Sequence, residues 1–99
     1  IAVMEFKTTK RDLEAVFAKI QSQVEDATLP DEESVNRLAR LARKMHQLAD
    51  EDWMDEAEDF SHLAGQLLNA VKKGDVEGCV MLVESLDDAQ SFCHRTFRD

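Results

Sequence analysis

The amino-acid sequence predicts an all-α fold, an up-down-up-down antiparallel four-helix bundle that uses residues 1–99 as a single domain. Four stretches repeat apolar residues at helical spacing, and short polar connectors separate them. Only three glycines and one proline occur among 99 residues, while 43% hydrophobic and 33% charged residues suit long amphipathic helices. No stretch alternates polar and apolar residues, and no Asn-Gly or Asp-Gly turn predicts a hairpin.

The first two predicted helices span about residues 2–27 and 30–49. Pro30 is expected at the first helical position of the second helix, followed by acidic residues that complement the helix macrodipole. The two apolar stripes are Phe6, Leu13, Val16, Phe17, Ile20 and Val24, then Val35, Leu38, Leu41, Ala42, Met45 and Leu48. Along the outside and flanks of the second helix lie Arg37, Arg40, Arg43 and Lys44.

The third and fourth predicted helices are joined by a glycine. The third follows the junction "DEDWMDE" and ends at Lys73, because Gly74 is a good helix stop. Asp75 can cap the fourth helix, which is expected to reach about Arg98. The two inward faces are Trp53, Ala57, Phe60, Ala64, Leu67 and Val71, then Val76, Cys79, Val83, Leu86, Gln90, Cys93 and Phe97.

The charge and hydropathy of the chain exclude some partners. The net charge is -9, so nucleic acid is not an expected partner, because phosphate binding needs clustered lysines and arginines. The acidity favours a basic protein partner. No apolar run approaches the roughly 18 residues that a membrane span needs.

The cellular compartment has two readings. The chain begins with Ile1, so removal of a signal peptide would make the protein periplasmic, whereas Met4 as a natural start would make it cytosolic. Cys79 and Cys93 lie on one predicted helix, about 21 Å apart, and cannot form a disulfide with each other. The cysteines therefore do not decide between the two compartments.

His94 is the most informative candidate for chemistry. It falls near the inward face of the fourth predicted helix, one turn after Gln90. A histidine between helices needs a hydrogen-bond partner, a metal ion or a haem iron. The alternative is a histidine at the edge of the core, satisfied by backbone or water. His62 is expected in solvent and His46 at the flank of its helix.

Other site patterns are incomplete. Asp59 and His62 match the carboxylate-x-x-His step of di-iron bundles, but a di-iron site needs that step twice. The other two histidines lack a carboxylate three residues earlier, since Arg43 precedes His46 and Ser91 precedes His94 at that spacing. No C-x-x-C or H-x-x-x-H spacing supports zinc. Without a nucleophile elbow or a Gly-rich phosphate loop, the sequence does not predict an enzyme.

The segment "GDVEGCVMLVESLDDAQSFCHRTFR" resembles the C-terminal helix of the soluble cytochrome b-562 family and its cytochrome c′ relatives. The positions in register are Gly74, Val76, Leu86, His94, Phe97 and Arg98. Cytochromes c′ end in C-x-x-C-H-x-x-aromatic-basic, which Cys93 and His94 match while Gln90 stands at the first cysteine position. The match covers about a quarter of the chain.

The resemblance implies a haem between the helices near the C-terminal end of the bundle. His94 would be the proximal iron ligand, and Cys93 would form a single thioether bond or none. Either Arg98 or Arg95 would pair with a haem propionate. Phe97 belongs to the same ending. A homodimer is a further expectation from this family.

The distal side of the implied haem departs from the family pattern. Phe6 occupies the position where the cytochrome b-562 pattern has an iron-binding methionine. The iron would then be five-coordinate, with an apolar wall formed by Phe6, Phe60 and Leu67, as in cytochromes c′. Such a site favours small gases over simple electron transfer.

Two hypotheses follow from the sequence. In the first, the protein is a haem-binding bundle, either a small electron carrier with a redox partner protein or a gas binder. In the second, the missing cysteine and methionine mean that haem is absent, and the bundle is a protein-interaction or sensory module. His94, Phe97 and Arg98 would then be ordinary capping and packing residues.

Overall fold

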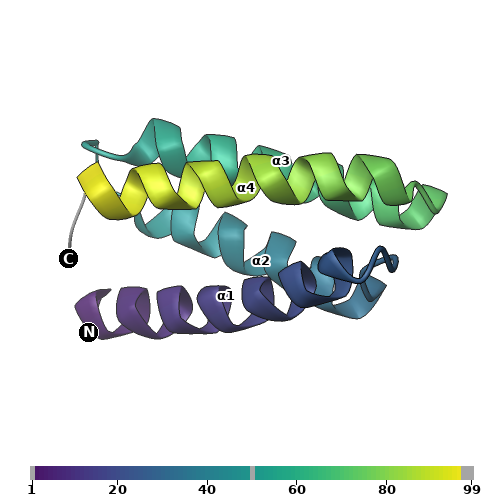
Figure 1. The fold of residues 1–99 in the computed structure, drawn as a ribbon. Helices are drawn as coiled ribbons and strands as arrows, with labels where there is room; N and C mark the ends of the chain where they lie inside the picture. Colours follow the sequence, from purple (N-terminus) through teal and green to yellow (C-terminus); the bar gives the residue numbers. More distant parts are fainter. Residues whose placement is uncertain (1, 50, 97–99) are drawn as a thin grey trace.

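The computed structural model describes the backbone of residues 2–49 and 51–96 and the side chains of residues 5–49 and 51–90. The helices are α1 (Ala2–Glu25), α2 (Glu32–Leu48), α3 (Met54–Lys73) and α4 (Val76–Thr96). Figure 1 shows them side by side, each antiparallel to the next. The predicted all-α four-helix bundle is confirmed, and the described ranges contain no strand.

The helices run along the whole molecule. The molecule measures 37 × 22 × 19 Å, and a helix of the length of α1 is about 36 Å long. The N-terminal end of α1, the α2–α3 connection and the C-terminal end of α4 lie at one end of the bundle (Figure 1). The α1–α2 and α3–α4 connections lie at the other end.

The four helices are not packed equally. Helix α2 packs closely on α1 and α3, and α3 packs closely on α2 and α4, whereas α1 and α4 make the loosest neighbouring pair. Across that pair, Gln21 Nε2 donates a hydrogen bond to Asp87 Oδ1 at 3.2 Å. The bundle is therefore closed on three sides and looser on the α1–α4 side.

Helix α2 begins later than the sequence predicts. Asp31 is the N-cap, because its Oδ2 accepts hydrogen bonds from Ser34 N at 3.1 Å and from Ser34 Oγ at 2.9 Å. Gln23 Oε1 accepts the Asp31 N–H at 3.1 Å and so ties the connection to α1. Pro30 thus lies one residue before the N-cap, and its predicted place at the first helical position was wrong. It is instead fully buried.

The α3–α4 turn follows the prediction. Gly74 adopts a left-handed backbone conformation with φ 71°, and its N–H donates to the carbonyls of Ala70 and Val71. Asp75 Oδ1 then accepts the N–H of Gly78 at 3.0 Å and caps α4. The predicted stop at Gly74 and cap at Asp75 are both confirmed.

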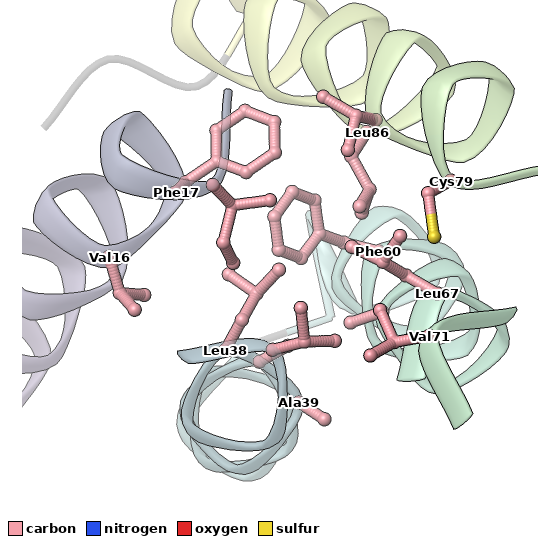
Figure 2. Packing of buried hydrophobic residues seen from close by; sticks show 14 of the residues in the cluster. Val16, Phe17, Leu38, Ala39, Phe60, Leu67, Val71, Cys79 and Leu86 are labelled. Atoms are coloured by element: carbon pink, nitrogen blue, oxygen red, sulfur yellow. The ribbon is translucent and has the colours of Figure 1, made fainter. Parts of the chain in front are cut away.

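The core joins side chains from all four helices (Figure 2). Its centre holds the Phe17 and Phe60 rings, whose centroids are 6.3 Å apart in an edge-to-face arrangement. Among the described side chains, no buried polar atom lacks a hydrogen-bond partner. The buried cluster consists of Leu13, Val16, Phe17, Ile20, Val35, Leu38, Ala39, Ala42, Phe60, Ala64, Leu67, Ala70, Val71, Cys79, Val83 and Leu86.

Candidate functional site

The residues predicted to ligate and flank haem lie mostly at the end of α4. Cys93 and His94 belong to the last turns of α4, and their side chains lie outside the described residues, as do Phe97 and Arg98. The part of the predicted site that the structure describes is the apolar wall of Phe6, Phe60 and Leu67.

Phe6 is placed at the end of the bundle by its contact with Trp53. The two rings are 5.2 Å apart between centroids, with an interplanar angle of 72°. Trp53 lies directly before α3, and both side chains are half-buried. This pair therefore covers the end of the bundle where α1 begins and α2 connects to α3. Helical periodicity predicts that Trp53 lies on an inward face, but it does not predict the contact with Phe6.

Phe60 and Leu67 are part of the closed core. Phe60 is 8% exposed and Leu67 is 0% exposed. The Phe60 ring packs against Phe17, and Figure 2 shows it extending from α3 into the centre of the bundle. Both side chains are already covered by neighbouring apolar groups.

Leu67 also lies at a different level of the bundle from His94. Leu67 is six residues before the end of α3, or about 9 Å from the α3–α4 turn. His94 is eighteen residues after the start of α4, or about 27 Å from the same turn. The two positions are thus about 18 Å apart along the bundle axis.

The described wall residues do not fit a haem at the predicted place. Phe6 contacts Trp53, Phe60 contacts Phe17, and Leu67 lies in the half of the core near the α3–α4 turn. A porphyrin between them would have to separate Phe60 from Phe17 and remove core contacts, which costs several kcal/mol for each large side chain. Haem binding by these three residues stays a prediction, and it would require this rearrangement of the core.

The other candidate ligands are scattered. His62 is exposed, with its Nε2 3.3 Å from Gln66 Nε2, and His46 is half-buried at the flank of α2. Met45 packs against the core, and Met81 is 69% exposed. Within the described side chains, no group of three His, Cys, Asp or Glu residues could hold a metal ion.

Cys79 is a free thiol in the core. Burial raises its pKa, and the negative charge of Asp75 raises it further. The thiol is therefore held neutral, which is the opposite of what a nucleophilic or metal-binding cysteine needs.

The charge of the chain is divided unequally between its two halves. Residues 1–48 contain eight basic and eight acidic residues, whereas residues 49–99 contain four basic and thirteen acidic residues. The whole net charge of -9 therefore belongs to the second half. Exposed acidic side chains of α3 and α4 are Asp55, Glu58, Asp59, Glu77, Glu84, Asp87 and Asp88. The division is present in the sequence itself, in the positions of the charged residues along the chain.

A groove of about 420 Å³ lies between α1 and the first turns of α2. Its charged lining has both signs, because Lys19 and Arg37 stand among three carboxylates. The lining consists of Asp12, Ala15, Val16, Lys19, Asp31, Glu33, Ser34 and Arg37. A groove of mixed charge does not select an anion or a cation.

The comparisons add no relative to this description. The chain matches no protein-family model, no curated protein and no solved structure. In the part of the chain that the structure describes, no helix has the length and apolar character needed to cross a membrane.

Proposed function

We propose that the protein is a haem-free four-helix module that binds a basic partner protein through the acidic outer faces of α3 and α4. The observation that carries this proposal is the location of the whole net charge in residues 49–99, together with the exposure of the α3 and α4 carboxylates. A concentrated charge of one sign steers a partner of opposite charge and raises the association rate.

The closed core supports the haem-free part of the proposal. Phe60 and Leu67, two of the three residues expected to line the haem, are covered by the packing of the core. The bundle then serves as a rigid frame that holds carboxylates one helical turn apart. The partner's arginines and lysines are the groups such carboxylates bind.

Addition of haemin to the purified protein tests the haem-free part. We expect no stable Soret band, and we expect His94→Ala to leave the haemin spectrum and Tm nearly unchanged. A Soret band that the wild-type protein retains and His94→Ala loses would overturn the proposal. That result would restore the haem-binding electron carrier or gas binder, with His94 as the iron ligand and a redox partner protein for the carrier.

A labelled lysine-rich helical peptide tests the acidic face. The variant D55N/E58Q/D59N removes three exposed carboxylates from α3, and E25Q/D26N/E33Q removes three from the α1–α2 half. Fluorescence anisotropy should show a loss of peptide affinity of about tenfold for the α3 variant and a much smaller loss for the control. Equal losses would show that only the total charge matters and would contradict docking on this face.

A further inference from the structure

The outer face of α2 concentrates positive charge on an acidic protein. Arg40, Arg43 and Lys44 stand at positions i, i+3 and i+4 and are all exposed. These spacings place the three side chains on one side of the helix. They are called the basic triad below. Arg37 lies one turn before Arg40 and is also exposed.

The arginines of this face are not used inside the bundle. Lys44 Nζ reaches Glu5 Oε1 at 3.3 Å, but among the described residues Arg40 and Arg43 pair with no carboxylate. The chain has 21 acidic residues for 12 basic ones, so carboxylates are plentiful. A planar guanidinium group binds a carboxylate through two parallel hydrogen bonds, so two unpaired arginines favour an acidic surface as the occupant.

The same chain carries an acidic surface of the same pattern. Asp55, Glu58 and Asp59 stand at i, i+3 and i+4 on α3 and are all exposed. This acidic triad repeats the spacing of the basic triad on the neighbouring helix. Met54, one of the large hydrophobic side chains exposed on the surface, directly precedes it.

The two triads lie at nearly the same level of the bundle. The centre of the basic triad is about six residues, or about 9 Å, before the end of α2. The centre of the acidic triad is about three residues, or about 4.5 Å, after the start of α3. Since α2 and α3 are antiparallel neighbours joined at that end, the two levels differ by about one helical turn.

We propose that a second copy of this chain binds the α2–α3 face. A two-fold axis parallel to the helices places α2 of each copy opposite α3 of the other. Both basic triads then meet both acidic triads, and the interface closes as a dimer. The dimer shares the α3 carboxylates with the basic partner of the proposed function but also requires the arginines of α2, so R40E/R43E distinguishes the two proposals.

The size of the face sets the strength of the dimer. Helix α2 is about 25 Å long, and two packed helices are about 20 Å wide, so each copy buries about 500 Å². A total of about 1,000 Å² is at the lower limit of specific interfaces and corresponds to a weak, reversible dimer. At about 0.15 M salt the Debye length is about 8 Å. Repulsion between distant acidic residues of the two copies is therefore screened more strongly than the attraction between the triads in contact.

Sedimentation equilibrium of the full chain between about 20 and 200 μM tests this dimer, a range that suits a weak interface. We expect a dimer whose association constant falls about tenfold between about 0.1 and 0.5 M NaCl. The variants R40E/R43E and E58K/D59K should each be monomeric, because like charges then face each other. An equimolar mixture of the two should form a heterodimer, since the mixed pair restores opposite charges in both contacts.

The control variant is K7E/R11E, which changes two exposed basic residues of α1 and matches the net charge of R40E/R43E. It should dimerise like the wild-type chain, and circular dichroism should show that all variants are folded. A wild-type chain that stays monomeric would overturn the proposal, and so would an equimolar mixture of R40E/R43E and E58K/D59K that stays monomeric. Dimers of both R40E/R43E and E58K/D59K would show that a different surface forms the dimer. A monomeric K7E/R11E control would show that the total charge alone decides.

Discussion

Asp31 shows how a single side chain sets the beginning of a helix. Its carboxylate accepts hydrogen bonds from the backbone and the hydroxyl group of Ser34, so the N-terminal end of α2 is satisfied at that point. These two hydrogen bonds lower the pKa of Asp31 below its ordinary value of 3.8. Pro30, which precedes this N-cap, lies outside the helix and is fully buried.

Replacement of Asp31 should reveal both the cap and its charge. We expect Asp31→Ala to lower Tm by a few degrees at pH 7, because the Ser34 N–H loses its acceptor. Asp31→Asn retains a capping oxygen and should be much closer to wild type. Because the pKa of Asp31 is lowered in the folded state, its carboxylate stabilises the fold above pH 3.8, and this stabilisation is lost as the pH falls from 3.8 through the lower folded-state pKa.

Thermal melting of the three proteins between about pH 7 and 3 measures these effects across the ordinary aspartate range. The difference between wild type and Asp31→Asn should shrink in acid, since protonated aspartate and asparagine are both neutral. A difference that grows as the pH falls would contradict the assigned role of the carboxylate.

At the scale of the helical element, Gly65 within α3 and Gly74 at the C-cap of α3 have opposite roles. Gly74 has φ 71°, which residues with a Cβ rarely adopt, and it ends α3. Gly65 lies inside α3, and a Cβ built there meets no atom within 4 Å. Space is therefore available at both positions, and only the backbone conformation distinguishes them.

Alanine substitutions at the two glycines should change stability in opposite directions. Gly74→Ala should cost about 1 kcal/mol, because alanine is strained in the left-handed region. Gly65→Ala should add about 1 kcal/mol, because alanine favours the helix over glycine. Urea unfolding of both variants measures the two free energies, and a stabilising Gly74→Ala would show that the turn relaxes to another conformation.

These elements also show what the sequence can predict. Helix ends such as Gly74 and Asp75 depend on residues a few positions away, so their chemistry is visible in the sequence. The Phe6–Trp53 contact joins residues far apart in the chain and depends on how the helices are aligned. The position of Leu67 along the bundle axis was not predictable for the same reason, since helical periodicity gives its inward face but not its level.

At the scale of the whole molecule, packing and charge divide the bundle differently. Packing is tightest around α2 and α3, which each have two close neighbours, and loosest between α1 and α4. Charge instead separates a neutral α1–α2 half from an acidic second half.

The α3 carboxylates belong to both proposed interfaces, so a second copy and a basic partner would compete for them. Dimer formation would then limit partner binding at high protein concentration.

The unequal packing predicts unequal protection from hydrogen exchange. Exchange from a folded helix requires local opening, which is easier where fewer neighbouring helices must be displaced. We therefore expect the central amides of α1 to exchange about tenfold or more faster than those of α3, corresponding to a difference of about 1.4 kcal/mol in opening free energy. Native-state hydrogen exchange followed by NMR measures both helices in one sample.

Equal protection of α1 and α3 would mean that the α1–α4 side is as tightly closed in solution as the rest of the bundle. Faster exchange in α1 would instead identify that side as the first to open.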